Sequence, residues 1–206
     1  SVQDALLSAE KNEKGIVDVD AIPSQGNSQM ILCKGDITRL NADAVVNAAN
    51  SALLGCFYPC HGCIDNAIHS AAGLQLRKEC SRIMQQQGTE EPVGHAKITA
   101  GYNLPCKYVI HTVGPVVHGY LTQSDRADLK SCYTSCMETA FRRNLRSIAF
   151  CCISTGEFHF PNYEAAEIAV STVYDMLKRN DTKLKVLFDV LKDTDYKIYR
   201  ELLRQY

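Results

Sequence analysis

Apolar and polar positions alternate in two different rhythms along this chain, and together they predict strands and helices in turn. Short, nearly continuous apolar runs are typical of strands covered on both faces, whereas apolar residues three and four positions apart are typical of helices that bury one side. The apolar runs predict strands at 29–33, 44–47, 96–101, 108–113, 147–153 and 184–191. The helical spacing predicts helices at 64–72, 73–87, 127–143, 164–178 and 195–205.

This order of elements predicts the fold class. Strands that alternate with helices favour an α/β sheet with helices on both faces. The first 28 residues are polar, with one short helix predicted near 4–11, so we expect 1–28 to form an N-terminal extension and 29–206 to form one domain. A chain of 206 residues is long enough to bury a sizeable core.

Composition and charge indicate which kinds of molecule this protein is expected to bind. The formal net charge is −1, so overall electrostatics favour neither nucleic acid nor an anionic membrane. The basic cluster of Arg142, Arg143 and Arg146 is predicted to be the solvated end of a helix. No apolar stretch is long enough to span a bilayer, and the N-terminus lacks a signal-peptide pattern. We therefore expect neither nucleic acid nor membrane as a partner.

The ten cysteines do not resemble a disulfide framework. Most of them lie inside apolar runs, such as Cys33 and the pair Cys151 and Cys152, where a free cysteine behaves as a small apolar residue. This usage favours a reducing compartment, so we expect a cytoplasmic protein.

Four residues form a compact group of potential metal ligands between Asn50 and Asp65, namely Cys56, Cys60, His61 and Cys63. Thiolate and imidazole are the ligands that zinc prefers. A site with three protein ligands keeps a position open for water or substrate, which is the catalytic arrangement. We predict Cys56, His61 and Cys63 as ligands, with Cys60 in reserve. The alternative is that these thiols bind no metal and pack as small apolar groups.

Three other segments follow predicted strands and are candidate ligand-binding loops. Residues 35–38 contain Asp36, which suits an amine donor or, alternatively, a turn or helix N-cap. Residues 46–51 contain two asparagines, which suit sugar hydroxyls or, alternatively, a turn. Residues 154–161 follow the most apolar strand and precede a helix, a position that suits a phosphate group.

These motifs together resemble a macrodomain. The similarity rests on GDIT at 35–38, DAVVNAANS at 43–51, DNAIHSAAG at 65–73, YVIHTVGP at 108–115, and ISTG at 153–156 followed by Phe160 and Pro161. The resemblance covers residues 29–205 and implies a three-layer α/β/α sandwich with a mixed central sheet. It also implies hydrolysis of ADP-ribose from modified protein side chains.

One segment sets this chain apart from the common hydrolytic macrodomains. Where those have a glycine-rich stretch, this chain has the longer GCFYPCHGC at 55–63. That replacement is similar to the zinc-dependent macrodomains of microbes, which are often encoded beside a sirtuin-type ADP-ribosyltransferase. The resemblance therefore implies zinc as cofactor and an ADP-ribosylated protein as substrate, with a lipoylated carrier protein of the glycine-cleavage type as a candidate.

The resemblance also implies roles for individual residues. Asp36 is expected to hold the adenine amine, and Ile37 to contact the ring or to present its backbone. Asn50 is expected to contact the distal ribose, with Asp65 beside it as base or orienting group. The predicted pyrophosphate loop consists of Ser154, Thr155, Gly156 and Glu157, and Phe158 is expected near the distal ribose. If Glu157 contacts phosphate, it should do so through its backbone N–H, with the carboxylate turned away.

Three functions remain open at this point. The first is a zinc-dependent protein ADP-ribosylhydrolase, in which Asn50 and Asp65 take part in catalysis. The second is an ADP-ribose-binding module without activity, in which the zinc is structural. The third is a deacetylase of O-acetyl-ADP-ribose.

Overall fold

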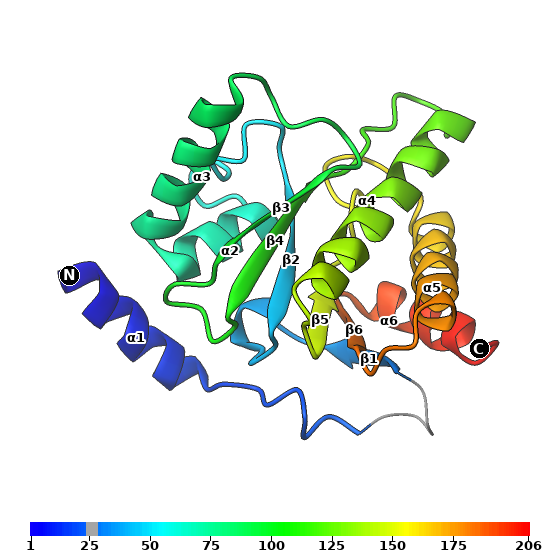
Figure 1. The fold of residues 1–206 in the computed structure, drawn as a ribbon, viewed down its shortest axis with the longest axis horizontal. Helices are drawn as coiled ribbons and strands as arrows, with labels where there is room; N and C mark the ends of the chain where they lie inside the picture. The colour runs from blue at the N-terminus through cyan, green and yellow to red at the C-terminus, as the bar shows by residue number, and fades with distance from the viewer. Residues whose placement is uncertain (24–28) are drawn as a thin grey trace.

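The computed structural model describes residues 1–23 and 29–206, and its centre is a mixed sheet (Figure 1). Six strands lie in the order β1-β6-β5-β2-β4-β3. All neighbouring pairs are parallel except β3 and β4, so the antiparallel strand lies at one edge. The strands are β1 (Met30–Lys34), β2 (Ala44–Ala49), β3 (Ala96–Ala100), β4 (Tyr108–Val113), β5 (Ser147–Phe150) and β6 (Lys185–Val190).

Helices cover both faces of this sheet. Helix α2 contacts β2, and α3 contacts β3. Helix α4 contacts β3 and β4, and α6 contacts β1 and β6. Helix α5 packs between α4 and α6, on the opposite side of the sheet from α2 and α3 (Figure 1). The helices are α1 (Val2–Lys14), α2 (Ile64–Ala72), α3 (Leu74–Gln87), α4 (Gln123–Arg142), α5 (Asn162–Arg179) and α6 (Asp193–Leu203). The expected three-layer α/β/α sandwich with a mixed sheet is confirmed.

Most predicted elements agree with the structure to within a few residues, but the strand predicted at 147–153 is too long. The observed strand β5 ends at Phe150, opposite Phe188 of β6. Residues 151–153 remain largely buried although they leave the sheet. The apolar residues at 151–153 therefore indicate that this segment is buried, not that it pairs with a neighbouring strand.

The N-terminal extension begins with a helix that is docked onto the domain. Helix α1 starts with a capping box between Ser1 and Asp4. The Asp4 carboxylate also accepts hydrogen bonds from Gln75 at 2.5 Å and from Asn103 at 3.1 Å. The helix predicted near 4–11 is thus longer, and part of the predicted extension, 24–28, lies outside the described residues.

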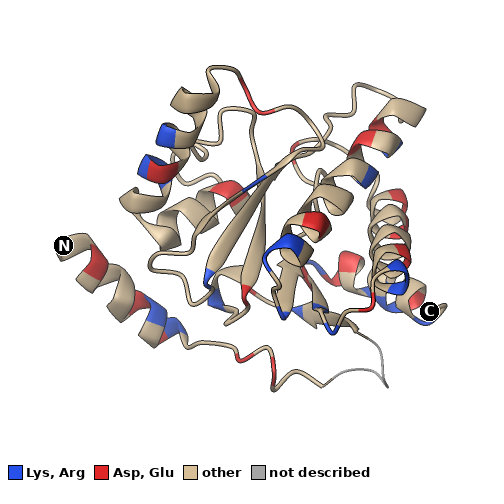
Figure 2. Cartoon of the chain, in the orientation of Figure 1, with Lys and Arg blue, Asp and Glu red and all other residues tan. Residues whose placement is uncertain are grey.

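Charged residues of both signs are interspersed over the helices (Figure 2). Arg142 ends α4, and Arg142, Arg143 and Arg146 are all exposed, as expected for the solvated end of a helix. Within the described ranges, none of the helices combines the length and apolarity needed to cross a membrane.

The parallel strands bring the predicted loops to a single edge. The chain leaves the carboxyl ends of β1, β5 and β2 at Gly35, Cys151 and Asn50, all on the same side of the sheet. Ligands of open α/β sheets bind outside this edge. The fold therefore positions the candidate loops next to one another.

Candidate active site and metal centre

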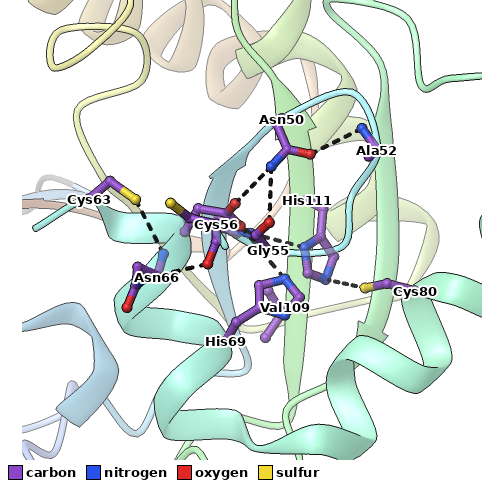
Figure 3. A network of polar contacts seen from close by, with 12 residues as sticks. Asn50, Ala52, Gly55, Cys56, Cys63, Asn66, His69, Cys80, Val109 and His111 are labelled. Atoms are coloured by element: carbon purple, nitrogen blue, oxygen red, sulfur yellow. Dashed lines mark hydrogen bonds and ion pairs between the residues drawn. The ribbon is translucent and has the colours of Figure 1, made fainter. Parts of the chain in front are cut away.

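The loop from β2 to α2 carries the potential metal ligands and is shaped by a glycine. Gly55 has a φ of 83°, which favours glycine, and a side chain there would lie 2.7 Å from the ring of His69. The backbone therefore runs directly over His69, and the chain that follows, from Cys56 to Cys63, projects from the carboxyl edge. Figure 3 shows Gly55 next to His69.

Three of the four candidate ligands converge. The ligand atoms of Cys56, His61 and Cys63 all lie within 4.8 Å of one another. The Sγ atom of Cys56 is 3.4 Å from Nδ1 of His61, whereas a sulfur and a nitrogen bound to one tetrahedral zinc lie about 3.6 Å apart. The residues present thus fit a zinc ion. Cys60 lies outside this group and is exposed, with a φ of 57°.

Helix α2 contributes to the site through its first turn. Cys63 is the N-cap of α2, and its Sγ accepts a hydrogen bond from the backbone N–H of Asn66 at 3.4 Å. The side chain of Asn66 donates to the carbonyl of Tyr58 at 3.2 Å and to that of Cys56 at 3.5 Å. Asn66 therefore ties the loop to the helix, and its backbone N–H partly opposes the burial that raises the pKa of the Cys63 thiol.

The pKa shifts within this group favour a thiolate at Cys56 beside a protonated His61. A hydrogen bond from the backbone N–H of Tyr58 is the main cause that lowers the pKa of the Cys56 thiol, and His61 adds to it. Conversely, Cys56 and then Glu157 raise the pKa of His61. Burial is the main cause that raises the pKa of Cys63, and the neighbouring Cys56 adds to it. A bound cation would favour both thiolates.

The two predicted catalytic residues lie in contact beside this group. The side chain of Asn50 donates from Nδ2 to Oδ2 of Asp65 at 3.3 Å and to the carbonyl of Gly55 at 3.2 Å. Asp65 is buried, which raises the pKa of its carboxyl, although a hydrogen bond from Asn47 opposes this. Asn50 and Asp65 are thus held together two residues from Cys63.

A buried hydrogen-bond network lies behind Asp65 and sets its orientation. Asn47 donates from Nδ2 to Oδ1 of Asp65 at 2.8 Å, and the same Nδ2 lies 3.2 Å from Nδ1 of His111. Because this amide nitrogen only donates, His111 accepts at Nδ1 and carries its proton on Nε2. Nε2 lies 2.9 Å from the hydroxyl of Thr99 and donates to it. Burial lowers the pKa of His111 to about 3, so the ring stays neutral.

A second group of potential ligands, His69, Cys80 and His111, is entirely buried. Both ring nitrogens of His111 are already used in the network around Asp65, so His111 offers no free nitrogen to an ion. Burial also lowers the pKa of His69 to about 4, which keeps that ring neutral below Gly55. We therefore interpret this group as part of the core that supports Asp65.

The predicted adenine-binding residues lie at the far end of the same edge. Asp36 caps the short 3-10 helix η1 (Ile37–Arg39), because its carboxylate accepts from the N–H of Thr38 at 3.0 Å and from the Thr38 hydroxyl at 2.6 Å. The alternative role considered for Asp36 is therefore present in the structure. Ile37 is buried.

The predicted pyrophosphate loop leaves β5 between these two ends. Ser154 and His159 have φ values of 64° and 55°, and the N–H of Phe160 donates to the carbonyl of Ser154 at 2.9 Å. Within the described residues, the N–H groups of Gly156 and Glu157 have no acceptor and are free to bind an anion. The carboxylate of Glu157 is turned towards His61, 3.4 Å from Nε2. Phe158 is half-buried, and its carbonyl accepts from Val117.

Sequence reasoning missed the residues that hold the site in place. Asn66, His111 and Thr99 were not singled out, and Asn47 was considered only as a sugar-binding or turn residue. A polar residue inside an apolar strand, such as His111 in β4, is the signal that could have indicated a buried network.

Comparisons with known proteins identify the family of this chain. Residues 46–169 match the model of the Macro domain. The chain is 52% identical over 189 residues to a protein-ADP-ribose hydrolase of Treponema medium, which covers 92% of this chain and 72% of that protein. It is 51% identical over 203 residues to a protein-ADP-ribose hydrolase of Staphylococcus aureus, covering 98% and 76% respectively.

The solved structure of an Oceanobacillus iheyensis macrodomain with ADP is also similar. It has a TM-score of 0.77 and 39% identity, and the match covers 84% of this chain and 89% of that one. The family model spans the candidate metal centre, the Asp65 network and the loop after β5. The chain therefore belongs to the Macro domain family.

Proposed function

We propose that this protein hydrolyses ADP-ribose from ADP-ribosylated protein side chains, with a zinc ion held by Cys56, His61 and Cys63. The two relatives that are about 50% identical over most of this chain are named protein-ADP-ribose hydrolases, which supports the reaction class. The convergence of three zinc-type ligands within 4.8 Å of one another supports the metal.

The observation that carries the proposal is the order of the loops along the carboxyl edge. Asp36 follows β1, the loop at 154–158 follows β5, and Asn50 follows β2, in that spatial order. This is the order of the adenine, the pyrophosphate and the distal ribose in ADP-ribose. Strands β1 and β2 are three positions apart in the sheet, about 14 Å at the usual strand spacing, so one extended ligand can span the loops.

Each part of the proposed ligand lies next to residues that can form hydrogen bonds with it. Asp36 offers a carboxylate to the adenine amine beside Ile37. The free N–H groups of Gly156 and Glu157 donate to phosphate oxygens, within the loop formed with Ser154, Thr155 and Phe158. Asn50 and Asp65 then face the distal ribose, next to the metal ligands.

Hydrolysis adds water across the bond that links the distal ribose to the protein and releases ADP-ribose and the free side chain. Bound zinc supplies an electrophilic centre that lowers the pKa of water or polarises an oxygen. The chain's own residues position the reactants: Asn50 holds the sugar, and Asp65, fixed by Asn47 and Asn50, orients the attacking water.

The finer identity of the substrate is part of this proposal. The segment at 55–63 supports membership of the zinc-dependent, sirtuin-associated subclass, for which an ADP-ribosylated, lipoylated carrier protein in the cytoplasm is the candidate substrate. Incubation with that carrier, and with O-acetyl-ADP-ribose in parallel, tests the preference through the ADP-ribose released from each.

The decisive experiment removes one metal ligand and one nearby cysteine separately. We expect Cys63→Ala to abolish release of ADP-ribose from modified protein while ADP-ribose still binds, because the loop after β5 and Asp36 remain intact. Cys60→Ala is the matched control and should keep wild-type turnover, since Cys60 lies outside the ligand group. Full turnover by Cys63→Ala, or release that a chelator does not reduce, would exclude a catalytic zinc. A wild-type protein that binds ADP-ribose but releases none is a binding module.

A further inference from the structure

The imidazole of His61 makes contacts on both sides of its ring. Its Nδ1 lies 3.4 Å from Sγ of Cys56, on the side of the metal ligands. Its Nε2 lies 3.4 Å from Oε1 of Glu157. His61 belongs to the loop after β2 and Glu157 to the loop after β5, and these two strands are neighbours in the sheet. This contact therefore joins the loop that carries the metal ligands to the loop with the free N–H groups.

The loop that carries Glu157 is held in a defined conformation. The N–H of Phe160 donates to the carbonyl of Ser154 at 2.9 Å, and the N–H of His159 donates to that of Gly156 at 3.1 Å. The carbonyl of Phe158 accepts from the N–H of Val117 at 2.9 Å. Because both ends of the loop are fixed, an anion bound to its N–H groups restrains the backbone from which the Glu157 carboxylate projects.

We infer that Glu157 is a positioning residue that couples the metal site to the phosphate-binding loop. Its carboxylate accepts the Nε2 proton of His61, which leaves the Nδ1 lone pair directed at the position shared with Cys56 and Cys63. Partners of this kind on the outer nitrogen fix the tautomer and orientation of a metal-binding histidine. This inference rests on the proposed function, because it takes the metal and the ADP-ribose as the two ligands.

The exposure of the pair explains why the coupling requires ligands. The side chain of Glu157 is 71% exposed and that of His61 is 28% exposed, and an ion pair in such a position contributes little by itself. A metal on Nδ1 restrains the ring, and a phosphate on the loop restrains the carboxylate. Binding of either ligand therefore reduces the conformational entropy that is lost when the other ligand binds. This coupling is reciprocal.

The test measures zinc affinity, not turnover. The apparent zinc dissociation constant of the full chain is determined by competition with a chromophoric chelator, with and without saturating ADP-ribose. We expect ADP-ribose to tighten zinc binding in the wild type. Glu157→Ala should weaken zinc binding by about 10- to 100-fold and abolish the effect of ADP-ribose. Glu157→Gln keeps an acceptor oxygen without the charge, so its zinc affinity should lie between those of the wild type and Glu157→Ala.

The control and the contrary outcomes separate this inference from the proposed function. Glu167→Gln, on an exposed position of α5, should bind zinc as the wild type does. Zinc affinity within twofold of the wild type in Glu157→Ala overturns the inference, as does an equal effect of ADP-ribose on both proteins. If the expected series appears but the zinc-loaded wild type releases no ADP-ribose from modified protein, the inference stands and the proposed hydrolysis fails.

Discussion

At the scale of single residues, Asp65 is held by hydrogen bonds to both oxygens of its carboxylate. Asn47 donates to one carboxylate oxygen and Asn50 to the other, at 2.8 and 3.3 Å. The same Asn47 nitrogen lies 3.2 Å from Nδ1 of His111, so both contacts suit one orientation of the amide. A reversed amide would place its oxygen against the Asp65 carboxylate. The buried pair of Asn47 and His111 thus supports the orientation of the Asp65 carboxylate.

A second buried carboxylate, Asp189 of β6, predicts how stability depends on pH. Burial raises the pKa of Asp189 from 3.8 to about 6, and the nearby charge of Asp36 adds to this. Between about pH 4 and pH 6 the unfolded chain therefore binds fewer protons than the native protein. The free energy of unfolding falls as the pH rises through this window.

Asp189→Asn removes the free-energy cost of ionising this buried carboxyl. We expect the variant to be more stable than the wild type by about 1–3 kcal/mol above pH 6 and equally stable below pH 4. Urea denaturation at several pH values measures the difference, and Asp181→Asn at an exposed position serves as the control. A difference that stays constant with pH would contradict this assignment.

At the scale of elements, the loop between β2 and α2 is fixed at three points. Gly55 passes over His69, the Asn66 side chain bonds the carbonyls of Cys56 and Tyr58, and Cys63 caps α2. The three candidate ligands, Cys56, His61 and Cys63, are therefore brought together by the fold itself. Only the third of these contacts is a helix cap, where a backbone N–H lacks a partner within the helix.

Two glycines of this loop provide a matched pair of substitutions. Gly55→Ala introduces a Cβ 2.7 Å from the His69 ring at a φ of 83°, so we expect a loss of about 2–4 kcal/mol and weaker zinc binding. Gly62→Ala meets nothing within 4 Å and should leave both properties unchanged. Thermal unfolding and zinc titration report the two effects. Equal behaviour of the two variants would show that the approach to His69 does not constrain the loop.

At the scale of the whole molecule, the sheet separates the two ends of the proposed ligand. Asp36 and Asn50 follow strands that are three positions apart in the sheet. Residues at this separation, without shared partners, contribute independently to binding. Asn50 and Asp65, in contrast, are in direct contact at 3.3 Å.

This separation predicts additive effects on ADP-ribose affinity. Asp36→Ala and Asn50→Ala should each weaken binding by roughly tenfold or more, and the double variant should lose the sum to within about 0.5 kcal/mol. Combining Asn50→Ala with Asp65→Asn should deviate from the sum, because each change alters the partner of the other. Isothermal titration calorimetry gives all the values needed. Strong coupling between Asp36 and Asn50 would mean that they do not bind opposite ends of one ligand.

Much of the fold was predictable from local pattern. The bounds of α2 and β4 agree with those predicted at 64–72 and 108–113, because apolar spacing reports which face of an element is buried. The strand predicted at 147–153 was wrong at its end, because a buried residue after a strand is as apolar as one within it. The sequence also predicted a group of thiolate and imidazole residues within eight positions, and the structure brings three of them together.

The sequence alone determined which elements form, which residues have metal-binding chemistry, and which family the motifs resemble. These properties depend on neighbours within a few positions, so they can be read along the chain. The tertiary structure decided that Cys60 stays apart from Cys56, His61 and Cys63, that Asn47 and His111 support Asp65, and that Glu157 reaches His61. Those contacts join residues 18 to 96 positions apart. They depend on strand order and on the close approach of backbones, which no local pattern of residues encodes.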